Sequence, residues 1–174
     1  MTTREAPEDG FTRDEIADLR KLLDIERIRK KKVLYSHLID SRDFAGFADL
    51  YTEDAVGEWG PFGNWSGREQ IHDAVAGYLA SRPAYSGLHI TSNMWIEKTG
   101  QDTATSRCYL HDVNTEQPPN VSHVAWFAVY EEDWVRIGGD WKISHHRIYF
   151  LWPSREVDRV SGEFPHPIEI SAIG

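Results

Sequence analysis

The spacing of apolar residues changes once along this chain of 174 residues, from a helical period to a period of two. Between residues 12 and 40 apolar side chains recur mostly at intervals of three and four, which predicts a long amphipathic helix ending near Asp40. Thr12 and Glu15 fit a capping box, a side-chain arrangement that satisfies free N–H groups at a helix start. A break in this helix near Asp24 is left open.

Shorter elements are predicted next, and turn-rich sequences separate them. They are a helix over 44–50 that Asp43 caps, a helix exit over 51–54, a strand over 55–59, and a helix from a second capping box, Ser66 with Glu69, to Pro83. Four long strands follow, over 88–98, 103–114, 121–135 and 141–152, with turns at 99–102 and 138–140 and a loop at 115–120. Helices first and hairpins last indicate an α+β domain with a mainly antiparallel sheet.

A curled sheet with helices on its concave side encloses a pocket, and binding sites are usually concave spaces of this kind. The expected organisation is a disordered tail over 1–11, one α+β domain over 12–152 and a C-terminal extension over 153–174. The length suits one domain with a substantial core.

The composition argues against several classes of partner and cofactor. The chain has 19 basic and 28 acidic residues and a net charge of −9, which argues against nucleic acid as a partner. Cys108 is the single cysteine, so no internal disulfide is expected. There is no apolar run of 18 residues and no apolar N-terminal leader, so we expect a cytoplasmic protein that does not span a membrane. Eight histidines show no spacing typical of a metal site, so no metal or other cofactor is expected.

Four short motifs carry a resemblance to a known family: residues 35–43, Leu50-Tyr-Thr-Glu-Asp-Ala-Val56, the helix start at 67–71, and Gly139-Asp-Trp-Lys-Ile143. In this order they resemble the SnoaL-like family of the nuclear transport factor 2-like superfamily. The resemblance implies a cone-shaped α+β barrel in which three helices and a curled sheet enclose a pocket. It says less about function, because this fold carries many activities.

Within that superfamily, Asp40 and His89 match the Asp–His pair of scytalone dehydratase, bile-acid 7α-dehydratase and hexachlorocyclohexane dehydrochlorinase. A carboxylate beside an imidazole fixes its tautomer and makes it a general base. Tyr35, five residues before the aspartate, matches a tyrosine of the bile-acid enzyme, and its alternative is core packing. Ile39 replaces the tyrosine that precedes the aspartate in scytalone dehydratase, which argues against a scytalone-like substrate.

Two further residues are candidates for stabilising an oxyanion or protonating a leaving group. His111 shares one strand face with Tyr109 and Val113, and it reaches the pocket if that face is concave. Arg147 matches a pocket arginine on the last strand of related dehydratases, with a surface salt bridge as its alternative. Candidate substrate-binding residues are Trp59, Phe62, Trp65, Tyr85, Asn93, Trp126 and His145.

The sequence thus predicts a lyase, a dehydratase or isomerase without a cofactor, that acts on a hydrophobic oxygenated small molecule of polyketide, steroid or aromatic type. The alternatives are a cyclase or hydrolase in the same pocket, and a small-molecule-binding domain without chemistry. An open sheet face rich in aromatic residues favours a homo-oligomer. A trimer is expected rather than a dimer, because the dehydratases that the chain resembles are trimers.

Overall fold

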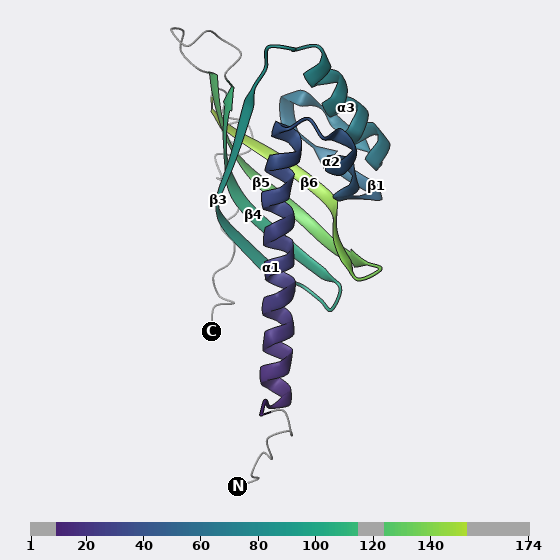
Figure 1. The fold of residues 1–174 in the computed structure, drawn as a ribbon, viewed down its shortest axis with the longest axis vertical. Coiled ribbons are helices and arrows are strands. Elements are labelled where there is room, and N and C mark those ends of the chain that lie inside the picture. The colour runs from purple at the N-terminus through teal and green to yellow at the C-terminus, as the bar shows by residue number, and fades with distance from the viewer. Residues whose placement is uncertain (1–9, 115–123, 153–174) are drawn as a thin grey trace, which may run out of the picture.

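The computed structural model describes residues 10–114 and 124–152 (Figure 1). The elements are α1 (Arg13–Asp40), α2 (Phe44–Asp49), β1 (Tyr51–Glu58), a 3-10 turn η1 (Gly60–Phe62), β2 (Asn64–Ser66), α3 (Arg68–Ala80), β3 (Gly87–Lys98), β4 (Thr103–Asn114), β5 (Val124–Ile137) and β6 (Asp140–Trp152). The predicted C-terminal extension, the loop at 115–120 and most of the predicted N-terminal tail lie outside the described residues.

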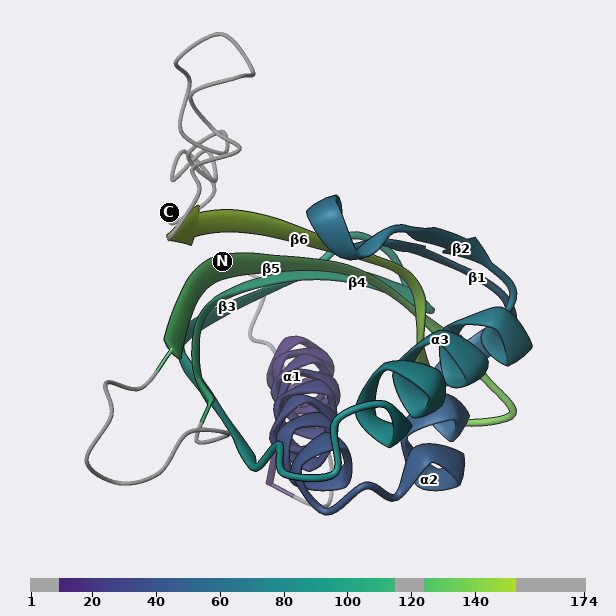
Figure 2. The same ribbon diagram turned by 90° about the horizontal axis from the view of Figure 1, so that it is seen from above.

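The strands form a six-stranded sheet in the order β2-β1-β6-β5-β4-β3. All neighbouring strands are antiparallel except β1 and β6, which are parallel. The sheet curls around α1, and α2 and α3 lie beside the same concave side (Figure 2). The predicted α+β fold is therefore confirmed, and the cone is formed by a curled sheet that does not close.

The first helix starts and continues as its sequence predicts. Thr12 and Glu15 form the reciprocal capping box, and α1 runs unbroken past Asp24 to Asp40. Asp43 caps α2 by accepting a hydrogen bond from the backbone N–H of Gly46 at 2.9 Å.

Two local predictions are wrong. The second capping box does not form, because Ser66 belongs to β2 and α3 starts after Gly67, whose φ of 95° suits glycine. The segment expected as a helix exit is instead the start of β1, where Tyr51 pairs with Ile143 of β6. This parallel pairing joins segments far apart in the chain, so local periodicity does not reveal it.

A buried ion pair lies between α1 and β5 in the core. Lys32 Nζ contacts Glu132 Oε1, and both side chains are at most 1% exposed. The Ser106 hydroxyl donates to the other oxygen of Glu132, and the Trp134 indole N–H donates to Ser106 at 2.8 Å. Burying a charge is costly unless it is paired and hydrogen-bonded. The ion pair supplies the first condition for both residues, and Ser106 supplies the second for Glu132.

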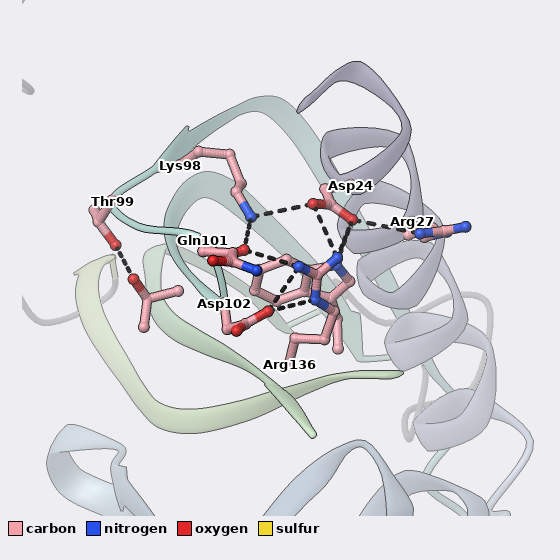
Figure 3. A network of polar contacts seen from close by, with 9 residues as sticks. Asp24, Arg27, Lys98, Thr99, Gln101, Asp102 and Arg136 are labelled. Carbon is pink, nitrogen blue, oxygen red and sulfur yellow. Dashed lines mark hydrogen bonds and ion pairs between the residues drawn. The ribbon is translucent and has the colours of Figure 1, made fainter. Parts of the chain in front are cut away.

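The N-terminal half of α1 is attached to the hairpin ends of the sheet through Asp24 (Figure 3). Its carboxylate accepts hydrogen bonds from Lys98 at 3.1 Å, from Arg136 at 3.2 Å and from the Trp141 indole N–H at 3.2 Å. Burial alone would raise the pKa of Asp24, but the hydrogen bonds and the two cations outweigh it and lower the pKa.

The convex face of the sheet carries several exposed apolar side chains. They belong to three neighbouring strands and are Leu88, Ile90, Tyr109 and Phe127. The predicted assembly through this face stays a prediction. None of the helices in the described part of the chain is both long and apolar enough to cross a membrane.

Candidate functional site

A cavity of about 120 Å³ lies between α1, α3 and the concave face of the sheet. Most of its walls are rings and aliphatic side chains. The lining residues are Tyr35, Ile39, Trp59, Phe62, Trp65, Ala74, Val75, Tyr78, Leu79, Tyr85, His89, Leu110, Asp112, Tyr130, Ile148 and Phe150. Polar chemistry is therefore confined to a few groups in an apolar space, as is typical of small-molecule sites.

The end of α1 and the start of β3 bring Asp40 and His89 together. His89 Nδ1–H donates to Asp40 Oδ1 at 2.6 Å, and the His89 backbone N–H donates to Oδ2 at 3.1 Å. Two hydrogen bonds from one residue hold the carboxylate in place, and in the neutral form of the ring the proton on Nδ1 leaves Nε2 as the basic nitrogen. His89 lines the cavity, whereas Asp40 lies behind it. The contact expected between these two residues is present.

Asp112 is a site residue that sequence reasoning missed. It lies on β4 directly opposite His89 of β3, and its Oδ2 is 4.0 Å from His89 Nε2. Burial raises the pKa of Asp112, and the charge of Asp40 adds to the rise. The charge of His89 and the hydrogen bond from Tyr85 oppose it. Asp112 therefore keeps its proton to a higher pH than an ordinary aspartate does.

The loop between α3 and β3 places Tyr85 against this pair of strands. The Tyr85 hydroxyl donates to Asp112 Oδ1 at 3.3 Å, and its ring lies over Gly87. A Cβ at Gly87 would lie 2.8 Å from Tyr85 Cζ, so glycine provides the space for the ring. Arg42, two residues after Asp40, donates to the backbone carbonyl of Tyr85 at 2.8 Å. It also donates to a carbonyl in the last turn of α3 and to a second carbonyl in the loop, which fixes the loop to the end of α1.

Tyr35 lines the cavity and is 1% exposed. Burial raises the pKa of its phenol, which a hydrogen bond with Tyr130 partly offsets. Lys32 lies 4.0 Å from the centre of the Tyr35 ring and 3.7 Å from that of Tyr130. Tyr35 and Asp40 serve one cavity although they project from different sides of α1, because His89 extends from Asp40 to the cavity.

The comparison with protein families agrees with this architecture. The model of the SnoaL-like domain matches residues 20–147. The chain belongs to the SnoaL-like family. No curated protein sequence matches it.

Solved structures show the same fold at low sequence identity. A nuclear transport factor 2-like protein with a cystatin-like fold from Novosphingobium aromaticivorans has a TM-score of 0.72 and 23% identity over 86% of this chain and 95% of that one. The hexachlorocyclohexane dehydrochlorinase LinA-type3 from Novosphingobium barchaimii has a TM-score of 0.68 and 20% identity over 86% and 99% of the two chains. A protein provisionally assigned as a scytalone dehydratase from N. aromaticivorans has a TM-score of 0.66 and 19% identity over 75% and 85%. The neighbours of this SnoaL-like chain thus include enzymes that carry out eliminations.

His111 does not reach the cavity. Alternation along β4 turns Cys108, Leu110 and Asp112 toward the concave side, so His111 and Tyr109 lie on the convex face and are exposed. The His111 ring packs edge-on against Phe127 at 4.6 Å. The condition that made His111 a candidate, a concave position of this face, is therefore not met. The apolar character of Cys108 and Leu110 is the signal that identifies the inner face and, with it, Asp112.

Arg147 and His145 also lie outside the cavity. Strict alternation would put His145 and Arg147 on the same face as the buried Trp141 and Ile143. A bulge between Asp133 and Trp134 of β5 leaves Ser144 unpaired on β6 and turns His145 and Arg147 to the opposite face. Arg147 therefore pairs with Glu58 at 3.3 Å and with Asp133 at 3.2 Å, and His145 contacts Glu58 at 2.7 Å. The structure thus shows Arg147 in a surface salt bridge, the alternative to a place in the pocket.

The predicted aromatic lining is found for the most part. Trp59, Phe62, Trp65 and Tyr85 line the cavity. Trp126 does not, and instead packs behind Phe62 and Phe150 at centroid distances of 5.6 and 5.3 Å. Asn93 is exposed at a bulge of β3 with a φ of 52°, away from the cavity. Within residues 10–114 and 124–152, no three histidine, cysteine or carboxylate side chains group into a metal site.

Proposed function

We propose that this SnoaL-like protein is a lyase that eliminates water from a hydrophobic oxygenated small molecule by using its own side chains. One observation carries the proposal. His89 lines the cavity, its Nδ1 is bonded to Asp40, and its Nε2 on the opposite side of the ring lies 4.0 Å from Asp112 Oδ2. A base and a second titratable group thus meet at one place in an apolar space.

The reaction follows from this placement. His89 Nε2 removes a proton from a carbon next to a carbonyl, and the C–H electron pair forms the new double bond. The C–O bond to a hydroxyl group on the neighbouring carbon breaks, and the departing oxygen takes a proton from Asp112. Water leaves, and the proton on the imidazolium returns to the Asp112 carboxylate across the short gap between them. The side chains are then ready for another turnover.

The second group favours elimination over isomerisation. An isomerase needs one base that returns the same proton to a different carbon. An elimination that expels hydroxide needs a separate acid, and the raised pKa of Asp112 keeps it protonated over a wider pH range. Tyr35 and Tyr130 also line the cavity, and in this proposal one of their phenols donates to the carbonyl oxygen as it becomes an enolate.

The third possibility, a domain that only binds a ligand, predicts that Asp40 and His89 lie apart or that side chains fill the cone. Their hydrogen bond and the cavity beside them argue against it. The alternative of a cyclase or hydrolase differs in its product, which retains the oxygen that a dehydratase removes.

The test is turnover of a panel of neutral β-hydroxy ketones, followed by mass spectrometry for loss of one water. His89→Gln and Asp40→Asn should each lower kcat/KM on the order of 10²–10⁴-fold, the usual contribution of a positioned acid or base. His111→Gln is the matched control, since it removes an exposed histidine on the convex face and should leave turnover unchanged. The proposal fails if His89→Gln retains the activity of the wild-type protein, or if the product retains the oxygen.

A further inference from the structure

The geometry of the cavity points to a substrate class: we infer that it takes a neutral molecule whose buried part is a single six-membered ring, and that Phe62 sets this size limit. The inference rests on the proposed function for the role of the polar corner at His89. The limit on size and charge comes from the walls alone.

The volume gives the first argument. The cavity measures about 120 Å³. An apolar cavity of about 150 Å³ inside a protein holds one benzene molecule. The space is thus no larger than one ring needs, so at most a single ring is buried, and substituents or a second fused ring have to extend through the open side of the cavity. Protein interiors are close-packed, so these walls yield little.

The walls also select by charge. Among the described residues that line the cavity there is no lysine or arginine, and the ionisable groups other than phenols are His89 and Asp112. Asp40 lies directly behind His89 and places a carboxylate beside that corner. An anionic ligand would have to leave water for an apolar space that has this carboxylate next to it and no lysine or arginine in its lining. A neutral ketone or alcohol has no such cost.

Phe62 closes the cavity on one side. It lies on η1, between Gly60 and Gly63, which both have positive φ angles of 51° and 126°. Its ring contacts Tyr78 of α3 at 5.5 Å and Phe150 of β6 at 5.5 Å. One side chain therefore connects the helical wall to the sheet wall. Phe62 is 36% exposed, so its removal opens the space toward solvent and leaves the deep core intact.

The test compares two neutral ketones, cyclohexanone and 2-decalone, which differ by the four carbons of the second ring. The dissociation constants are measured by calorimetry and by quenching of tryptophan fluorescence, because Trp59 and Trp65 line the cavity. If the second ring could be buried, the four carbons would tighten binding on the order of 10²-fold, at about fourfold for each. The wild-type protein should show no such gain and should bind cyclohexanone at least as tightly.

Phe62→Ala should reverse this preference and bind 2-decalone at least tenfold more tightly than cyclohexanone. Phe127→Ala is the matched control, because Phe127 is also 36% exposed but lies on the convex face. It should behave as the wild-type protein does. Cyclohexanecarboxylate tests the charge limit, and it should bind the wild-type protein at least tenfold more weakly than cyclohexanone.

Tighter binding of 2-decalone than of cyclohexanone to the wild-type protein would overturn the size limit. The size limit would also be overturned if Phe62→Ala and Phe127→Ala showed the same preference between the two ketones. Binding of cyclohexanecarboxylate as tight as that of cyclohexanone would overturn the charge limit. All of these measurements are repeated in the His89→Gln background, where no proton removal is expected. If the His89→Gln variants keep these binding preferences but the wild-type protein turns over no β-hydroxy ketone, the proposed function is refuted and the size and charge limits stand. Dehydration of a bicyclic substrate would refute the size limit alone.

Discussion

Removal of one partner of the buried ion pair should destabilise the fold strongly, whereas removal of both charges should not. Lys32 and Glu132 are at most 1% exposed, so each charge depends on the other. Lys32→Met or Glu132→Gln leaves one uncompensated charge in the core, which costs about 3–5 kcal/mol. Lys32→Met also removes the cation that lies over two tyrosine rings, which places it at the upper end of that range.

The double variant Lys32→Met/Glu132→Gln leaves no charge at this buried site, and its glutamine oxygen can still accept the hydrogen bond of Ser106. Its free energy of unfolding should therefore lie above that of either single variant. The assay is urea unfolding at pH 7 followed by tryptophan fluorescence. The melting temperature Tm of each single variant should fall by about 6–20 °C, because a chain of this size loses about 2–4 °C of Tm per kcal/mol.

Arg29→Met provides the control, because Arg29 pairs with Glu26 on the exposed face of the same helix at 2.7 Å. An exposed pair contributes about 0–1 kcal/mol, so this variant should unfold nearly as the wild-type protein does. Two results would refute the reasoning. One is a cost for Lys32→Met no larger than that for Arg29→Met, and the other is a double variant that loses the sum of the single losses.

Three further predictions concern the site and its supports. Asp112→Asn should lower turnover of a β-hydroxy ketone on the order of 10²-fold. The wild-type rate should fall as pH rises through the raised pKa of Asp112, and a pH–rate profile in which only the wild-type protein shows this decline supports its role as the acid. Asp24→Asn should lower the free energy of unfolding at pH 7, and urea titrations should show this difference shrinking below about pH 4. The reason is that a lowered folded-state pKa stabilises the fold above the ordinary value of about 3.9 and loses that effect as pH falls through the folded value. Gly87→Ala should displace Tyr85 from Asp112, so kcat should fall while the free energy of unfolding stays near the wild-type value. A wild-type kcat in this variant would show that the contact of Tyr85 with Asp112 is not needed for turnover.

The sequence was sufficient for the elements whose signals are local. The capping box at Thr12, the cap at Asp43 and the change of period after Pro83 all depend on residues close in the chain, and they predict the order of elements well. The pairing of Asp40 with His89 came from the resemblance, since 49 positions separate them, and the structure places them in contact.

What the sequence missed depends on contacts between distant strands. Periodicity shows that His111 and Asp112 point to opposite faces of β4. Only the apolar Cys108 and Leu110 indicate which face turns inward, and the sheet that curls around α1 makes that face concave. The unpaired Ser144 reverses the faces of β6 for a similar reason, because a bulge is a property of the pairing with β5. Arg147 and His111 were for these reasons expected in a cavity that they do not reach.

The most direct test of proton removal by His89 is hydrogen–deuterium exchange in the proposed ligand itself. Cyclohexanone is incubated with the protein in D₂O, and deuterium at the carbons next to the carbonyl is followed by NMR. The wild-type protein should accelerate exchange above the buffer rate, and His111→Gln should match it. His89→Gln and Asp40→Asn should each lose that acceleration while still binding the ketone. Exchange at the wild-type rate in His89→Gln, or no acceleration by the wild-type protein although the ketone is bound, would contradict the account.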